Sequence, residues 1–214
     1  MSRASLKSPT ERGRAWAPRR LAGAALAALL VVGLAACSPD AATQEYLDGT
    51  HTGYVGADGG RYVGVAPADR GEPVVYGGVT EEGERFDSAD LLGEVVVVNF
   101  WYAACGPCRS EAPVLESVWQ DYQDRGVSFL GVNTRDQPET ALAFAKTYQV
   151  TYPSLIDIAT GEAKLAFAAV VPAQATPTTV VIDREGRVAA RLIGEIKEAS
   201  ILSSVVGDIL AEGA

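Results

Sequence analysis

Residues 95–113 contain the feature that most restricts how this chain can fold. A continuous run of β-branched and aromatic residues, Val95–Trp101, predicts a central strand covered on both faces. The chain then passes through Cys105 and Cys108 and enters a helical pattern that contains Pro113. A Cys-x-x-Cys pair therefore lies where a buried strand meets a helix, which predicts an α/β fold around this junction.

The two cysteines have different expected roles. Cys105 falls at the first turn of the helix, where free backbone N–H groups and the helix dipole favour an anion, so its thiol should ionise readily. Cys108 follows about one helical turn later, close enough to attack a mixed disulfide formed on Cys105. The spacing predicts a reversible dithiol/disulfide couple, with Cys105 as the nucleophile and Cys108 as the resolving cysteine.

Other uses of such a pair find little support in the sequence. A zinc site needs further Cys or His ligands, and the only others in the chain are Cys37 and His51. Haem attachment needs a histidine after Cys108, where Arg109 stands. We therefore predict no metal and no cofactor.

The first 36 residues form a predicted export signal. Six basic residues precede Leu21–Ala36, an uncharged run of 16 residues. This run is shorter than the roughly 20 residues of a membrane span and suits the core of a signal peptide. The run ends at Leu34-Ala35-Ala36-Cys37, which resembles a bacterial lipobox and implies lipidation of Cys37. An uncleaved anchor and an ordinary secretory signal are the alternatives, and all three export the domain.

The charge of the exported part limits its partners. Removing the signal leaves 12 basic residues (18 minus 6) and 26 acidic residues (27 minus 1), a net charge near −14. Such a domain is unsuited to nucleic acid or to anionic membrane surfaces, so membrane attachment would depend on the lipid. With Cys37 assigned to lipid, only Cys105 and Cys108 remain, and they can pair with each other.

The rest of the chain reads as a tether and one domain. Residues 37–65 are rich in Gly, Asp, Thr and Ala without a sustained period, which predicts a flexible tether. Residues 66–214 form the predicted domain. Strand–helix–strand spacing predicts parallel central strands, and the last two strands should form an antiparallel hairpin. The expected elements are a small β element with one helical turn (73–92), strands at 127–133, 152–157, 178–183 and 187–193, and helices at 108–125, 138–148, 161–167 and 197–210.

The redox stretch resembles the active site of thioredoxin-fold proteins. Asn99 and an inserted segment, Pro138–Phe167, make the chain similar to the exported, membrane-anchored thioredoxin-like proteins of the TlpA and ResA type, in the redoxin or AhpC/TSA-like branch of that fold. The resemblance implies a central mixed β-sheet flanked by helices, with an inserted βα-type segment and a small N-terminal β element. The residues that match the thioredoxin active site are Phe100, Trp101, Cys105-Gly106-Pro107-Cys108 and Pro113.

The resemblance also implies which residues support the redox pair. Trp101, Gly106 and Pro107 are expected to support the active site. Thr176-Pro177 stands where the fold holds a cis peptide bond, so Pro177 should pack against the disulfide while the Thr176 backbone pairs with an extended substrate segment. The alternative is an ordinary trans proline at the start of a strand.

Two residues depart from the pattern of broad thioredoxin reductants, which carry a buried acid at Asn99 and a second tryptophan at Ala104. An amide does not titrate, so the proton of Cys108 must pass to water or to another carboxylate. Glu111 and Glu195 are the two candidates. Ala104 leaves the rim of the site smaller and less aromatic, which implies a restricted range of clients.

The sequence thus predicts a monomeric, lipid-anchored extracytoplasmic thiol-disulfide oxidoreductase that acts on protein clients and on a membrane or extracytoplasmic redox partner. The Gly-Pro between the cysteines matches thioredoxin, whose potential of about −270 mV favours reduction of clients. The family resemblance implies cytochrome c maturation as the setting. The alternatives are a thiol peroxidase, which would carry Thr or Ser at Tyr102 and Pro at Val98, and a non-catalytic lipoprotein scaffold or binding module.

Overall fold

A computed structural model describes residues 52–55, 61–172 and 174–212. They all belong to one unit, residues Gly49–Ala214. The predicted signal (1–36), the predicted lipidation site Cys37 and the lone histidine His51 lie outside the described residues. No helix of the described part is long and apolar enough to cross a membrane.

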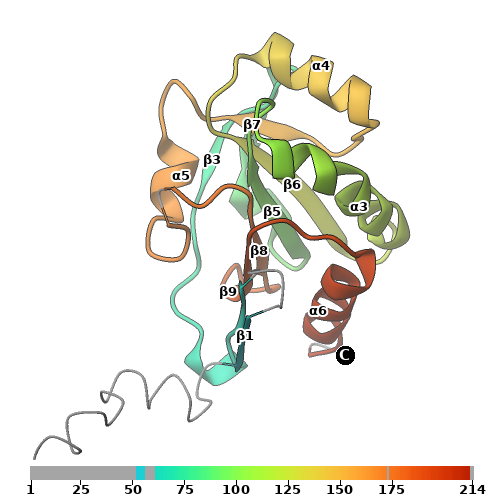
Figure 1. The fold of residues 1–214 in the computed structure, drawn as a ribbon. Helices are drawn as coiled ribbons and strands as arrows, with labels where there is room; N and C mark the ends of the chain where they lie inside the picture. Colours follow the sequence, from blue (N-terminus) through green and yellow to red (C-terminus); the bar gives the residue numbers. More distant parts are fainter. Residues whose placement is uncertain (1–51, 56–60, 173, 213–214) are drawn as a thin grey trace, which may run out of the picture. The chain divides into compact units, whose positions relative to one another are not determined.

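A mixed β-sheet forms the centre of the domain (Figure 1). Its strand order is β1-β2-β9-β8-β5-β6-β7. The pair β5·β6 and the pair β6·β7 are parallel, whereas β8 is antiparallel to both β5 and β9. The parallel centre and the antiparallel hairpin are therefore confirmed. The strands are β1 (Thr52–Val55), β2 (Arg61–Gly64), β5 (Val95–Trp101), β6 (Val127–Asn133), β7 (Ser154–Ile156), β8 (Thr178–Ile182) and β9 (Val188–Ile193).

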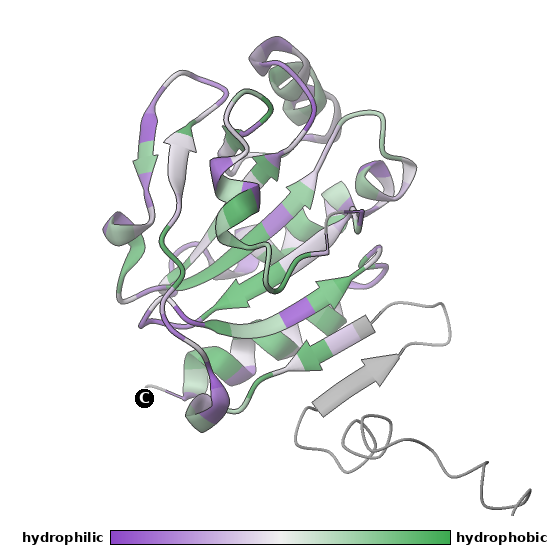
Figure 2. Cartoon of the chain, turned by 90° about the vertical axis from the view of Figure 1, so that its left-hand side faces the viewer, coloured by the Kyte–Doolittle hydropathy of each residue, from purple (hydrophilic) through white to green (hydrophobic). Residues whose placement is uncertain are grey.

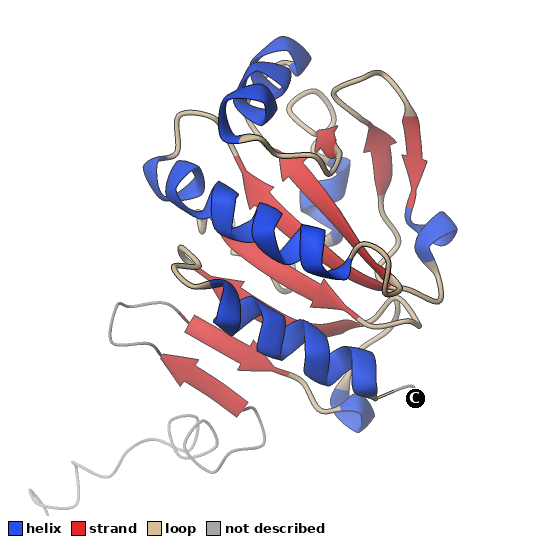
Figure 3. Cartoon of the chain, turned by 90° about the vertical axis from the view of Figure 1, so that its right-hand side faces the viewer, coloured by secondary structure: helices blue, strands red, loops and turns tan. Residues whose placement is uncertain are grey.

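Helices cover both faces of this sheet, and a separate hairpin packs beside it. Figure 3 shows α3 and α6 lying across one face, with α4 near the end of the sheet that carries the start of α3. The hairpin and α5 lie on the opposite side in Figure 1. These elements are α3 (Gly106–Tyr122), α4 (Pro138–Tyr148), α5 (Glu162–Ala166), α6 (Ala199–Ala211), the hairpin strands β3 (Gly77–Val79) and β4 (Arg85–Asp87), and the 3₁₀ turns η1 (Pro67–Asp69) and η2 (Ser88–Leu91).

Alternation along β5 divides the core into two layers. Every residue of β5 is buried, as the continuous apolar run predicts. Val95 and Val97 pack with α3 and α6, whereas Val96 and Val98 pack on the opposite face with the hairpin side. Figure 2 shows the central strands coloured mainly as hydrophobic. Asn99 follows Val97 by two residues and so lies on the same face of the strand. Its side chain is therefore directed toward α3.

Apart from shifts of a few residues at the ends of other elements, the structure differs from the sequence prediction at two places. Residues 52–55 form β1 and residues 61–64 form β2, which pairs with both β1 and β9, so the tether predicted for residues 37–65 extends too far. Tyr62 packs against the core on the α6 side, and this burial fixes the segment on the sheet. The helix predicted from Cys108 begins at Gly106, because Cys105 serves as its N-cap.

Candidate active site

The redox pair lies where β5 passes into α3. Cys105 is the N-cap residue of α3, and its Sγ accepts a hydrogen bond from the backbone N–H of Cys108 at 3.2 Å. The two cysteines form a disulfide with a Cα–Cα distance of 5.3 Å. Since the first N–H groups of a helix have no partner within it, this position stabilises negative charge on the Cys105 sulfur after reduction. The pairing that the spacing allowed is therefore present.

The immediate rim of the disulfide is small and partly open. Both cysteines are buried, whereas Ala104 and Pro107 are exposed and Gly106 is half-buried. Gly106 and Pro107 form the first turn of α3, where the missing N–H of a proline costs no helical hydrogen bond. Ala104, Gly106 and Pro107 therefore place no long side chain at the pair.

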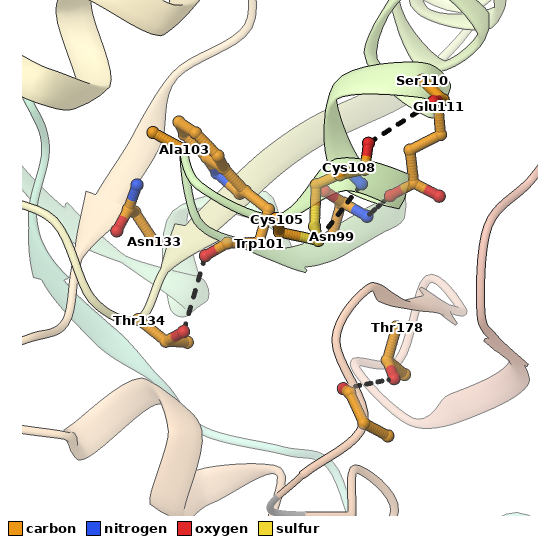
Figure 4. Close-up of a disulfide and its surroundings, with 12 residues drawn as sticks. Asn99, Trp101, Ala103, Cys105, Cys108, Ser110, Glu111, Asn133, Thr134 and Thr178 are labelled. Carbon is orange, nitrogen blue, oxygen red and sulfur yellow. Dashed lines mark hydrogen bonds between the residues drawn. A yellow bond between two sulfur atoms is a disulfide. The ribbon is translucent and has the colours of Figure 1, made fainter.

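Glu111 is a fully buried carboxyl group next to the pair. It lies one helical turn after Cys108 and has 0% of its surface exposed. Its Oε1 accepts a hydrogen bond from Asn99 Nδ2 at 2.9 Å, and its Oε2 accepts one from the backbone N–H of Ile196 at 3.0 Å. Figure 4 shows Glu111 and Asn99 joined beside the disulfide. Of the two carboxylates considered as proton acceptors, Glu111 is thus the one bonded into the site.

The surroundings of Glu111 favour its protonated form. Burial, together with a smaller contribution from the charge of Glu195, raises the pKa of the carboxyl to about 7 against the lowering effect of the two hydrogen bonds. Glu195 therefore contributes through its charge. A group with a pKa near neutrality can both take up and release a proton at physiological pH.

A narrow cavity adjoins Cys108 on the side of Asn99. Its volume is about 10 Å³, and Asn99, Trp101 and Ser154 also line it. This is close to the space that one water molecule occupies. Cys108 and Asn99 thus share the lining of one small cavity, while Glu111 reaches it only through its hydrogen bond to Asn99.

Trp101 supports the pair from the inside of the domain. It is buried in one cluster with Cys105 and Cys108, and its Nε1 donates to Ser154 Oγ at 3.2 Å. The Trp101 ring also stacks on Phe144 of α4, with ring centroids 4.3 Å apart. The inserted segment Pro138–Phe167 therefore contributes directly to the floor of the site.

The Thr176–Pro177 peptide bond is cis, as predicted. Pro177 is buried, and β8 begins at the next residue, Thr178, which pairs with Phe100 of β5. Pro177 thus lies at the end of β5 from which the chain runs toward Cys105. The Pro177 carbonyl accepts a hydrogen bond from the N–H of Gly194 at 2.9 Å, which ties this loop to the end of β9.

The sequence analysis missed a second group of polar residues at this edge, in the loop after β6. Asp136 Oδ2 accepts hydrogen bonds from the Ala103 N–H at 2.6 Å and from Asn133 Nδ2 at 2.9 Å. Thr134 donates its N–H to the Trp101 carbonyl at 3.1 Å. The loop therefore holds the segment that leads to Cys105. A sequence signal existed, because β5 and β6 are parallel neighbours and the residues after their carboxyl ends meet at one edge.

Across residues 52–55, 61–172 and 174–212, no cluster of three or more Cys, His, Asp or Glu side chains could hold a metal ion.

Comparison with known proteins gives consistent matches. Residues 73–191 match the AhpC/TSA family. The chain is 33% identical over 115 residues to the thiol-disulfide oxidoreductase ResA of Bacillus cereus, a match that covers 53% of this chain and 63% of that protein. The chain thus spans less than two thirds of the length of this curated relative.

Solved structures show the same fold. A thiol:disulfide interchange protein of the thioredoxin family from Chlorobium tepidum superposes with a TM-score of 0.61 at 31% identity, covering 68% of this chain and 99% of that one. A secreted thiol-disulfide isomerase from Corynebacterium glutamicum gives a TM-score of 0.64 at 28% identity, covering 74% and 96%. The predicted thioredoxin fold is therefore confirmed.

Proposed function

Since the chain belongs to the AhpC/TSA family, we propose that it is a thiol-disulfide oxidoreductase that exchanges disulfides with protein clients through Cys105 and Cys108. The single observation that carries this proposal is the disulfide at the start of α3 with a buried carboxyl group beside it. The similarity to ResA and to a thiol:disulfide interchange protein supports it.

The reaction begins from the reduced protein. The Cys105 thiolate attacks one sulfur of a client disulfide, forming a mixed disulfide and releasing the other client sulfur as a thiolate. Cys108 then loses its proton and attacks the Cys105 sulfur, which releases the second client sulfur. Two electrons pass from the protein dithiol to the client disulfide, and the Cys105–Cys108 disulfide is the product. The same steps in reverse oxidise a client.

Glu111 is the proposed proton acceptor for Cys108. Its raised pKa keeps it close to half-protonated at neutral pH, so it can receive the proton when Cys108 attacks and return it when the disulfide is reduced. The small cavity that Cys108 and Asn99 both line lies next to this carboxyl group's partner, Asn99. Asn99 holds the carboxyl group in place through its 2.9 Å hydrogen bond.

The client segment is proposed to bind across the rim. The backbone of Thr176, which is half-buried next to the cis bond, would pair with an extended peptide, and Pro177 would shape the surface beside the disulfide. Gly106 and Pro107 keep the approach to Cys105 open, while Trp101 supports the pair from below.

The cellular setting is proposed from the sequence. Lipidation of Cys37 would tether a monomeric domain on the extracytoplasmic side of the membrane, where a membrane or extracytoplasmic partner exchanges electrons with it. The description of one structural relative as secreted supports export. The Gly-Pro between the cysteines favours reduction of clients, and cytochrome c maturation is the proposed pathway.

Cysteine substitutions test the proposed reaction. A Cys108→Ser variant should accumulate a stable mixed disulfide between Cys105 and a model client, visible by non-reducing electrophoresis, because the resolving thiol is absent. A Cys105→Ser variant should neither form the adduct nor reduce the client. Reduction by the Cys105→Ser protein at the wild-type rate would refute the proposal. The equilibrium potential of the pair, measured against glutathione, then gives the direction of electron flow.

A thiol peroxidase is the second candidate, because peroxiredoxins share the fold and the inserted segment. The positions at which that activity would need Thr or Ser and Pro carry Tyr102 and Val98. Val98 is fully buried within β5 and carries no polar group for such a site. Consumption of hydrogen peroxide by the reduced protein well above the rate of a free thiol would restore this candidate.

A further inference from the structure

The exposed charges next to the disulfide differ in sign from those of the domain. Residues 66–212 contain 22 acidic and 11 basic side chains. Within 101–110, the only charged side chain is Arg109, and the loop 172–178 before β8 has none. The loop after β6 carries Arg135 and Asp136. These segments thus carry two basic side chains and one acidic side chain, on a domain in which acidic side chains outnumber basic ones two to one.

Arg109 lies directly over the redox turn. It is exposed and follows Cys108, and its backbone N–H donates to the Cys105 carbonyl at 3.2 Å. A Cβ placed on Gly106 would lie 3.9 Å from Nη2 of Arg109, so the guanidinium is close to the turn between the cysteines. Residues four apart share a helix face. Arg109 therefore lies beside the turn that carries the two cysteines.

Arg135 is held at the rim from the neighbouring loop. Its guanidinium carbon lies 4.3 Å from the centre of the Tyr102 ring, a cation–π arrangement. Its backbone N–H donates to Asn133 Oδ1 at 3.1 Å. The side chain is exposed, yet its base and its ring contact are fixed. A charge in a preorganised position binds a ligand at a lower entropic cost than a freely moving one.

Both guanidinium groups are available to a partner. Within the described part of the chain, the salt bridges involve Arg70 and Arg187 but neither Arg109 nor Arg135. The carboxylate of Asp136 is occupied by the Ala103 N–H and the Asn133 amide.

We propose that Arg109 and Arg135 form a docking rim for client segments that carry carboxylate side chains next to the reacting cysteine. This inference rests on the proposed function and adds a client class to it. An acidic client would otherwise be repelled by the overall charge of the domain, so the rim would supply local attraction where the general field opposes binding. Basic clients would gain from the general field but meet like charges at the site of reaction.

The expected size of the effect follows from the exposure of the two side chains. A solvent-exposed ion pair changes a rate or an affinity by roughly two- to fivefold. Two such contacts predict that an acidic client reacts about tenfold faster than a basic one of the same length. The preference should fall at high salt, because the Debye length shrinks from roughly 30 Å at 0.01 M to 3 Å at 1 M ionic strength.

Single-turnover reduction of matched peptides tests the proposal. Three fluorogenic peptide disulfides are compared that differ only in the residues flanking the cysteine, which are Asp, Lys or Ser. The purified protein is reduced and freed of reductant, and the second-order rate constant is measured for each peptide. The wild-type protein should prefer the Asp peptide about tenfold over the Lys peptide. The double variant Arg109→Glu/Arg135→Glu should invert this order.

The chain offers a matched control. Arg125 is exposed, follows the far end of α3 and stacks on a tyrosine ring in the same manner, with its guanidinium 4.5 Å from the Tyr122 centroid. Arg125→Glu should leave the Asp-to-Lys ratio unchanged. Using the ratio removes any effect of Arg109 on the reactivity of Cys105, since that effect is common to all peptides.

The outcomes separate the two proposals. Equal rates on all three peptides, or a preference that survives in the double variant, would overturn the docking rim while leaving the oxidoreductase function intact. Failure to reduce any peptide, including the neutral one, would count against the proposed function itself.

Discussion

The substitution Glu111→Gln should remove a pH-dependent term from the stability of the oxidised protein. The pKa of Glu111 is about 7 in the folded protein, against 4.5 for a free glutamate. Between these values the folded state binds more protons than the unfolded state, so stability falls as the pH rises. The contribution is fully present below pH 4.5 and lost above pH 7. At about 1.4 kcal/mol per pKa unit, the loss is on the order of 3 kcal/mol.

The glutamine variant also changes the hydrogen bonds of the site. Glu111 accepts from two donors, the Asn99 amide and the Ile196 N–H. A glutamine has one acceptor oxygen for them, so one donor loses its usual partner at a cost of about 1–3 kcal/mol. The variant should therefore be less stable than the wild type at pH 5. The difference should shrink or reverse at pH 8, where the wild type carries a buried charge.

Urea unfolding of the oxidised protein at several pH values measures this difference. Subtracting the unfolding free energy of the variant from that of the wild type cancels the contributions of the other titrating groups. Asp124→Asn, an exposed substitution just after α3, serves as the control. A wild-type-minus-variant difference that stays constant from pH 5 to pH 8 within about 0.5 kcal/mol would refute the raised pKa, because the linkage relation then assigns Glu111 no shift. The same variant should also resolve mixed disulfides at least tenfold more slowly at neutral pH, consistent with the loss of a general base.

Two further predictions concern contacts outside the sulfur chemistry. Asp136→Ala removes the acceptor of the Ala103 N–H at 2.6 Å and should cost about 1–3 kcal/mol in urea unfolding. Asp136→Asn, which keeps an acceptor oxygen, should cost less, and equal costs would contradict the role of this bond. Arg70→Ala leaves the buried Asp183 without one of its two arginine partners and should lower the unfolding free energy by about 3 kcal/mol. A loss below about 0.5 kcal/mol would show that the pair behaves like a surface ion pair.

The parts of the fold that the sequence predicted are those with strong local signals. The bounds of β5, β6 and α4 match the predictions, because a β-branched run between polar residues marks a central strand and Pro138 marks the first turn of a helix. The cis bond at Thr176–Pro177 was predicted only through the resemblance, since an isolated Thr-Pro pair is usually trans.

The burial of the Glu111 side chain was harder to predict. The buried positions of α3 include Cys108, Ala112 and Leu115, and Glu111 falls on the same face. A carboxyl group on the apolar face of a helix is a readable signal, but its partner Ile196 is 85 residues away in sequence. The contact of Asp136 with Ala103 and the pairing of β2 with β9 likewise depend on tertiary packing. Local patterns carry no information about such partners.

The position of Glu111 changes how the site handles its proton. The acid that general thioredoxin reductants carry on the central strand is replaced here by Asn99, and the carboxyl group comes instead from the helix that bears both cysteines. One helical turn thus fixes its position relative to Cys108. In the reduced protein, a Cys108 thiolate and a Glu111 carboxylate would be like charges within one buried site, an arrangement that burial disfavours. Under the proposed mechanism, a proton that leaves Cys108 passes to Glu111, which would keep the net charge of the site constant during resolution and avoid a doubly charged intermediate.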